Sequence, residues 1–184
     1  MKYACFDPAS KGIGYSIFEK KESGEIILEE IGFIRPDKIE GDSKKIPNIN
    51  QLSLMRGLKN KDFQDLKKRL ISEGASVIIE YTVRSKDVLT CVKLALMSGA
   101  LANEFGGMVN LVNSSVWTQK IPKEDRIDFI KSYIGNKELL EIMEKYPKYQ
   151  QEDIWDSIGI GLYSLQGLDY KKACSYGNKN KNRL

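Results

Sequence analysis

The order of its periodic segments constrains the fold of this chain more than any other feature. Three runs rich in β-forming residues come first, at residues 2–6, 14–19 and 25–35, and turn formers separate them. Helix-like segments then alternate with short apolar runs, so that residues 59–74 precede the run 76–80 and residues 86–107 precede the run 108–113. This order predicts a mixed five-stranded α/β sheet, with three antiparallel strands and then parallel strands, flanked by helices.

The remaining segments complete this plan. Residues 36–57 contain many turn formers and no sustained period, which predicts a long surface connection. Residues 122–134, 137–146 and 151–167 have helical periods. The run 76–80, "SVIIE", is β-branched and uninterrupted, as expected for a strand that is covered on both faces.

Composition narrows the possible functions. A chain of 184 residues with 41% hydrophobic and 29% charged residues is typical of one soluble domain, which we place at residues 1–170. No apolar run approaches the roughly 18 residues of a membrane span, and the N-terminus lacks a secretory stretch, so we expect a cytoplasmic protein of a bacterium, or of a phage or virus acting in its host. The absence of histidine excludes His-based triads and His-ligated zinc.

The C-terminal residues 171–184 are basic. They contain five Lys or Arg residues and no acid, as in tails that attract phosphate backbones, although a flexible, solvated terminus explains the tail equally well. The three cysteines are far apart and form no CxxC pair, so neither a disulfide framework nor a zinc knot is expected.

Four carboxylates stand at positions that the predicted sheet could bring together. Asp7 and Glu80 end two apolar strands, and ligands in such sheets sit at the carboxyl ends of parallel strands. Asp153 and Asp156 are three residues apart on one face of the last helix. Carboxylate oxygens suit Mg²⁺ or Mn²⁺, and pairs of such ions roughly 4 Å apart activate water in phosphodiester cleavage.

Each acid also has a structural explanation. Asp7 precedes Pro8 and could open a turn, and Asp153 and Asp156 could cap the start of a helix. Glu80 could simply reach solvent at its strand end, although an uncompensated carboxylate after a buried strand is costly. The combination of four acids favours a cation-binding site over these separate structural explanations.

Three blocks of the sequence resemble RuvC-like Holliday-junction resolvases of the ribonuclease H-like superfamily. "CFDPASKGIGYSIFE" resembles the first hairpin of that family, "VIIEYTVRSKDVLTCVKLALMSGAL" its second acidic strand and following helix, and "EDIWDSIGIGLYSL" its closing helix with a D-x-x-D pair. Their order and spacing match along nearly the whole chain. The resemblance implies a ribonuclease H-like fold, a homodimer, and Mg²⁺-dependent symmetric nicking of four-way DNA junctions without a small-molecule cofactor.

The resemblance also implies roles for individual residues. The metal-binding catalytic acids would be Asp7, Glu80, Asp153 and Asp156, with two ions per site and Mn²⁺ able to substitute. The active-site lysine of the family falls close to Lys123, and a slip in alignment would make it Lys120 or Arg126. A cation there would stabilise charge on the scissile phosphate, while the alternative is an exposed residue in a first helical turn.

Five residues are expected to contact DNA. The stacking aromatic of the family aligns with Val83, a departure that leaves Tyr81 as a candidate base-stacking residue or as packing. Charged residues near the predicted site could contact phosphates or remain solvated: Lys11, Arg84, Lys86 and Lys120. Ala9 and Ser157 are milder departures from the family pattern.

Three further questions stay open at the level of sequence. The helix at residues 86–105 has apolar residues over more than one stripe, which predicts either a dimer contact or complete burial in one domain. Trp117 is expected in the core or at a strand end, with the DNA surface as an alternative. Two other functions compete with the nuclease. One is a branched-DNA-binding protein without activity. The other is a ribonuclease H-like phosphotransferase or ATPase, because "DPASKGIG" partly matches the first hairpin that binds phosphate in those enzymes.

Overall fold

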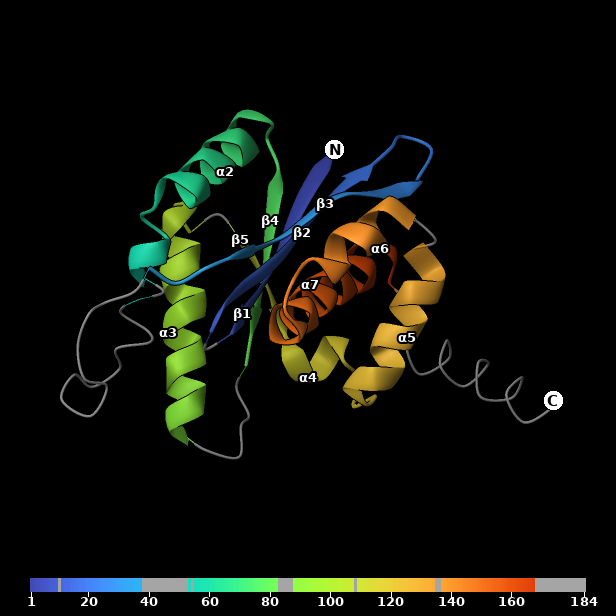
Figure 1. The fold of residues 1–184 in the computed structure, drawn as a ribbon. Helices are drawn as coiled ribbons and strands as arrows, with labels where there is room; N and C mark the ends of the chain where they lie inside the picture. The colour runs from blue at the N-terminus through green and yellow to red at the C-terminus, as the bar shows by residue number, and fades with distance from the viewer. Residues whose placement is uncertain are drawn as a thin grey trace.

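A computed structural model describes residues 1–9, 11–37, 53, 55–82, 88–107, 109–134 and 137–167. Within them, one five-stranded sheet has the strand order β3-β2-β1-β4-β5 (Figure 1). β1, β2 and β3 are antiparallel, and β4 and β5 continue the sheet in parallel with β1. The strands are Lys2–Ala9, Gly12–Lys20, Ile26–Ile34, Ser76–Tyr81 and Val109–Asn113. The predicted fold class is confirmed.

Helices cover both faces of this sheet (Figure 1). α2 (Lys61–Ser72) and α3 (Val88–Glu104) lie on one face, and the other carries α4 (Ser114–Trp117), α5 (Lys123–Ile134), α6 (Lys137–Glu144) and α7 (Lys148–Gln166). Asn60 caps α2 by accepting a hydrogen bond from the Phe63 amide at 2.9 Å, and Gly74 follows the helix in a left-handed conformation (φ 64°). Both signals were readable in the sequence.

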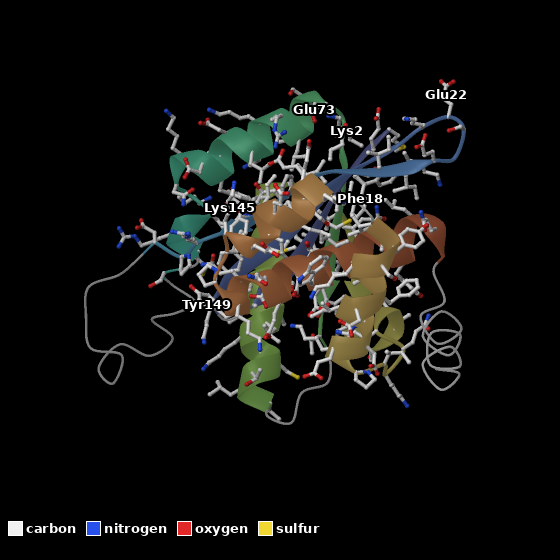
Figure 2. The ribbon with its side chains drawn as sticks, turned by 45° about the vertical axis from the view of Figure 1, so that its right-hand side comes forward. Lys2, Phe18, Glu22, Glu73, Lys145 and Tyr149 are labelled. Carbon is white, nitrogen blue, oxygen red and sulfur yellow. The ribbon has the colours of Figure 1, made fainter. Side chains whose placement is uncertain are left out.

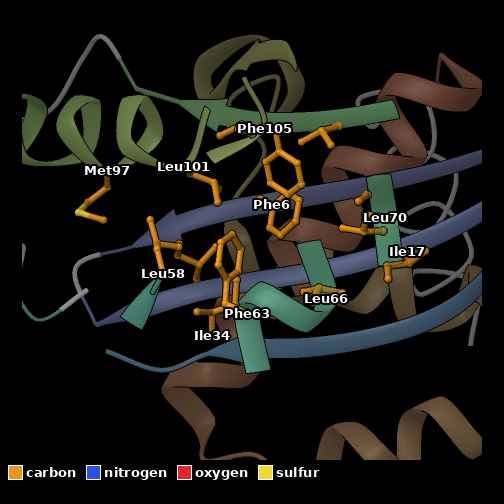
Figure 3. Packing of buried hydrophobic residues seen from close by; sticks show 14 residues of the cluster. Phe6, Ile17, Ile34, Leu58, Phe63, Leu66, Leu70, Met97, Leu101 and Phe105 are labelled. Carbon is orange, nitrogen blue, oxygen red and sulfur yellow. The ribbon is translucent and has the colours of Figure 1, made fainter. Parts of the chain in front are cut away.

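The core divides into two layers, one on each face of the sheet. On the α2 and α3 face, Phe6 and Ile79 pack with Phe63, Leu101 and Phe105 (Figure 3). On the other face, Cys5 and Ile78 pack with residues of α7 that include Trp155 and Ile158. Because side chains alternate along a strand, Asp7 and Glu80 lie on the same face as Cys5 and Ile78, toward α7.

The two ends of the sheet differ in character. Lys2, at the start of β1, forms ion pairs with Glu29 at 3.1 Å and Glu73 at 3.4 Å, and Glu22 projects from the β2–β3 hairpin (Figure 2). Such exposed pairs contribute little to stability. Asp7 and Glu80 lie at the opposite end of the sheet, where β1 and β4 finish. Among the described helices, none is long and apolar enough to cross a membrane.

The structure corrects three sequence-based expectations. α4, a single helical turn directly after β5, was not predicted. Residues 53 and 55–57 are helical, and Ser53 and Gly57 are buried, so the region 36–57 is not a surface connection throughout. α7 begins at Lys148, several residues before Asp153, and has no side-chain cap, so the capping explanation for Asp153 and Asp156 is wrong. Residues 171–184 lie outside the described residues.

Candidate active site

Asp7 and Glu80 come from neighbouring parallel strands. Phe6 of β1 pairs with Ile79 of β4, which brings the two following residues to the same end of the sheet. The Asp7 side chain is buried and that of Glu80 is half-buried. The structure therefore brings these two predicted residues together on the face that α7 covers.

α7 supplies the other two acids, and its close packing on β2 brings them near Asp7. Gly14 is the partner of Asp7 in the ladder, and a Cβ atom at Gly14 would lie 2.2 Å from the carbonyl oxygen of Asp153. Only glycine permits this approach. Asp156 follows one turn later and is buried. All four predicted acids thus lie in one region of the molecule.

The carboxylates perturb one another. Burial, and then the charges of Glu80, Asp156 and Asp153, raise the pKa of Asp7 well above its usual range. Burial raises the pKa of Asp153 to about 7, against the opposing charge of Lys123. Burial likewise raises the pKa of Glu80 to about 7, although a hydrogen bond from Trp117 lowers it. Desolvation and like charge are the causes expected where acids are gathered to bind a cation.

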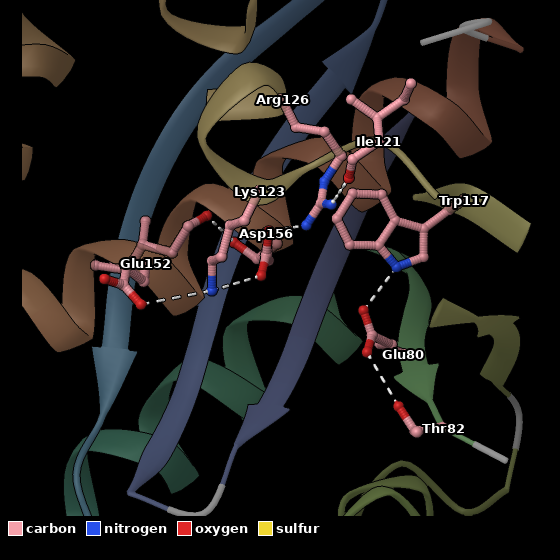
Figure 4. Close-up of polar contacts among 10 residues, drawn as sticks. Glu80, Thr82, Trp117, Ile121, Lys123, Arg126, Glu152 and Asp156 are labelled. Atoms are coloured by element: carbon pink, nitrogen blue, oxygen red, sulfur yellow. Dashed lines mark hydrogen bonds and ion pairs between the residues drawn. The ribbon is translucent and has the colours of Figure 1, made fainter. Parts of the chain in front are cut away.

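Two cations from α5 neutralise part of this charge (Figure 4). The ammonium group of Lys123 lies 2.8 Å from Oδ2 of Asp156 and 3.8 Å from Glu152, and the guanidinium group of Arg126 lies 3.1 Å from Oδ1 of Asp156. Burial alone would lower the pKa of Lys123, but Asp156 and then Asp7 and Asp153 raise it above its usual value. The structure thus places both Lys123 and Arg126 in the cluster.

Glu80 is held by residues that sequence analysis did not assign to the site. The indole nitrogen of Trp117 donates to Oε2 of Glu80 at 2.6 Å, and the hydroxyl of Thr82 lies 3.4 Å from Oε1 (Figure 4). Trp117 is 1% exposed, which confirms the core expectation and excludes the DNA-surface alternative. A buried tryptophan needs an acceptor for its N–H, and this was the available signal.

The residues that are expected to contact DNA lie in different places relative to the carboxylates. Lys11 is exposed in the β1–β2 turn, with its ammonium group 5.4 Å from the centre of the Tyr149 ring. Lys120 is exposed between α4 and α5 in a left-handed conformation (φ 62°). Tyr81 ends β4 on the face opposite to Glu80, so the structure does not bring it into the carboxylate cluster. Arg84 and Lys86, with Val83, lie outside the described residues.

The donor set suits a hard divalent cation. Burial and neighbouring negative charge favour the protonated forms of Asp7, Glu80 and Asp153, and a positive ion would reverse this. Oxygen ligands are those that Mg²⁺ and Mn²⁺ prefer. In the described part of the chain, no three Asp, Glu or Cys side chains stand close enough to hold one ion between them. A Mg²⁺ ion bound here would therefore use one or two carboxylates and complete its shell with water and substrate phosphate oxygens.

Comparisons with known proteins identify the fold. Neither a protein-family model nor a curated protein matches this sequence. Among solved structures, Thermus thermophilus RuvC in complex with a Holliday junction substrate matches with 14% identity and a TM-score of 0.59, over 91% of this chain and 97% of that chain. A second structure of Thermus thermophilus RuvC gives 14% identity and a TM-score of 0.55 over the same shares.

A eukaryotic protein shares the same architecture. The yeast mitochondrial Holliday junction resolvase matches with 15% identity and a TM-score of 0.51, over 99% of this chain and 86% of that chain. The chain therefore has the ribonuclease H-like fold of RuvC-like resolvases, and the resemblance predicted from its motifs is confirmed at the level of the fold.

Proposed function

We propose that this protein is a metal-dependent, structure-selective DNA endonuclease that resolves four-way junctions by paired, symmetric nicks. One observation carries the proposal: four carboxylates from β1, β4 and α7 gather at one end of a RuvC-like sheet, where burial and then the charges of neighbouring acids raise the pKa of Asp7, Glu80 and Asp153. A protein that only bound DNA would have no use for such a cluster, because uncompensated carboxylates repel phosphate.

The residues of the chain have separate roles in this proposal. Two Mg²⁺ or Mn²⁺ ions, when bound, would supply Lewis-acid activation of water and stabilise the leaving oxygen of the phosphodiester. The carboxylates that would hold them are Asp7, Glu80, Asp153 and Asp156. Lys123 is 36% exposed at its side chain, so it can leave Asp156 and stabilise charge on the scissile phosphate. Arg126, at 8%, is enclosed and stays with Asp156.

We also propose a homodimer, with α3 as the contact. Four apolar side chains of α3 are exposed, and three of them follow one another at intervals of four residues along one helical face: Val88 80%, Leu89 55%, Val92 49% and Leu96 58%. Complete burial of this helix in one domain, the competing expectation, is wrong. A two-fold dimer would present two sites to the two strands that a paired nick requires.

The test compares junction cleavage with binding. A labelled synthetic four-way junction and a linear duplex of the same sequence are incubated with Mg²⁺, with Mn²⁺ or with EDTA. We expect paired nicks near the crossover in the junction alone, in both metals and not in EDTA. Glu80→Gln should abolish the nicks while junction binding, measured by gel shift, is retained.

Glu22→Gln is the matched control. Glu22 is exposed at the tip of the β2–β3 hairpin, so the same chemical change there should leave cleavage at the wild-type rate (Figure 2). If wild type binds the junction tightly and cuts nothing in either metal, the alternative of a non-catalytic branched-DNA-binding protein replaces our proposal. If the protein neither binds nor cuts, both are wrong.

A further inference from the structure

A continuous chain of contacts joins Glu80 to Asp156 across the candidate site (Figure 4). The indole N–H of Trp117 donates to Oε2 of Glu80 at 2.6 Å. The guanidinium carbon of Arg126 lies 4.9 Å from the centre of the Trp117 ring, and an Arg126 nitrogen lies 3.1 Å from Oδ1 of Asp156. Two acids from different elements are thus connected through two side chains that are not themselves acids.

The position of Trp117 follows from the way α4 leaves the sheet. β5 runs parallel to β4, with Val112 beside Glu80, so the helix that follows β5 begins next to the end of β4. The side-chain oxygen of Asn113 caps α4 by accepting a hydrogen bond from the Ser115 amide at 2.9 Å, and the Ser114 hydroxyl accepts one from the Thr82 hydroxyl at 3.0 Å. These bonds fix a single helical turn whose last residue is Trp117.

Arg126 holds the other side of the ring. One of its terminal nitrogens donates to the carbonyl oxygen of Ile121 at 2.6 Å, and the other donates to Asp156. Its side chain is 8% exposed, and its Nε is buried without a hydrogen-bond partner among the described residues. An arginine that is stacked, paired and enclosed in this way is a fixed part of the structure.

We infer that Trp117 and Arg126 are positioning residues that fix Glu80 and Asp156 relative to each other and thereby set the affinity of the carboxylate cluster for divalent cations. The inference rests on the proposed function. Oε2 of Glu80 is committed to the indole, while among the described residues Oε1 has only the long contact with Thr82 and so keeps lone pairs for a cation. Partners that orient a metal-binding carboxylate in this way change metal affinity about 10- to 100-fold when they are removed.

Trp117→Phe is the direct test, because it keeps an aromatic ring for Arg126 and removes the N–H that binds Glu80, although the ring itself becomes smaller. Mn²⁺ binding is measured by titration calorimetry without DNA, and we expect the dissociation constant to rise about tenfold or more. Junction binding in EDTA should stay at the wild-type level, and excess Mn²⁺ should restore the cleavage rate. A merely structural role of Trp117 would affect junction binding and could not be rescued by metal.

Trp155→Phe is the matched control. Trp155 is also buried, at 4% exposure, and the ammonium group of Lys131 lies 5.6 Å from the centre of its ring. This variant should bind Mn²⁺ as wild type does. It also leaves Trp117 as the sole tryptophan of the chain, so quenching of its fluorescence by Mn²⁺ reports binding beside Glu80 independently of calorimetry.

Arg126→Lys provides a second route, in case Trp117→Phe folds poorly. It keeps the positive charge and removes the planar group that stacks on Trp117. Because both variants interrupt one chain of contacts, the affinity lost in the double variant should be smaller than the product of the two single losses.

The outcomes separate this inference from the proposed function. An Mn²⁺ affinity within twofold of wild type in both single variants overturns the inference alone. A wild-type protein that binds Mn²⁺ and loses affinity in Trp117→Phe, but cuts no junction, upholds the positioning pair and overturns the nuclease. A wild-type protein that binds no Mn²⁺ with or without junction DNA overturns both.

Discussion

Gly14 sets the distance between β2 and α7, and we expect its replacement by alanine to disable the candidate site. A Cβ atom at Gly14 would lie 2.2 Å from the carbonyl oxygen of Asp153 and 2.6 Å from the amide nitrogen of Ile154. Both are backbone atoms, so no side-chain rotation relieves the contact. α7 must therefore retreat by about 1 Å before the atoms reach ordinary van der Waals separation.

This retreat carries Asp153 and Asp156 away from Asp7 and Glu80. A misplacement of about 1 Å can reduce a catalysed rate about 100-fold, and inserting a methyl group into a packed interface costs roughly 1–3 kcal/mol. We expect Gly14→Ala to cut a labelled four-way junction about 100-fold more slowly in Mg²⁺. Urea denaturation should show a loss of about 1–3 kcal/mol in the free energy of unfolding.

Gly99→Ala is the control for this prediction. Gly99 lies within α3, and a Cβ atom there would meet nothing within 4 Å. Alanine should stabilise the protein by up to about 1 kcal/mol through helix propensity. Because Gly99 lies on the face of α3 proposed as the dimer contact, the control for the cleavage rate is Glu22→Gln. If Gly14→Ala had wild-type stability, α7 would not be packed on β2 as described. If it were destabilised but cut at the wild-type rate, the acids of α7 would not need their position beside Asp7.

Two further predictions concern charge and assembly. Burial raises the pKa of Asp153 from 3.8 to about 7, so the folded protein retains a proton that the unfolded chain releases, and this contribution to stability is lost as pH rises from about 4 to 7. Asp153→Asn cannot ionise, so its free energy of unfolding relative to that of wild type should rise on the order of 2 kcal/mol between pH 4.5 and pH 8, measured by urea denaturation in EDTA. The same difference between variant and wild type at both pH values would contradict this prediction. Leu96→Glu places a charge on the exposed face of α3, so we expect it to convert the dimer to a monomer in analytical ultracentrifugation. Ile142→Glu, on the exposed surface of α6, is the control and should remain a dimer. A wild-type protein that is monomeric would refute the dimer proposal.

The sequence predicted those features that depend on short-range pattern. Alternation and turn residues placed the three antiparallel strands, and the uninterrupted run before Glu80 indicated a strand buried on both faces, which β4 is. The same alternation put Asp7 and Glu80 at strand ends, and the three-residue interval put Asp153 and Asp156 on one helical face. The strand and helix that carry each acid were therefore determined locally.

Some features were within reach of the sequence and were missed. Tyr81 follows Glu80 directly, so strand alternation already places the two side chains on opposite faces of the sheet. The four-residue helix that ends at Trp117 is too short to produce a period, although Asn113 is a good cap for it. The start of α7 at Lys148 was obscured because acids suit a first helical turn as well as a binding site.

The tertiary structure alone decided which cations and partners reach the acids. The sequence favoured Lys123 as the active-site cation and left Lys120 and Arg126 as alternatives. Packing of α5 against α7 places Lys123 and Arg126 on the two oxygens of Asp156 and leaves Lys120 exposed. The bond from Trp117 to Glu80 joins residues that are 37 positions apart. Exposure of Val88 and Leu96 likewise depends on what packs against α3. Such contacts are set by the relative placement of whole elements, which local periodicity does not encode.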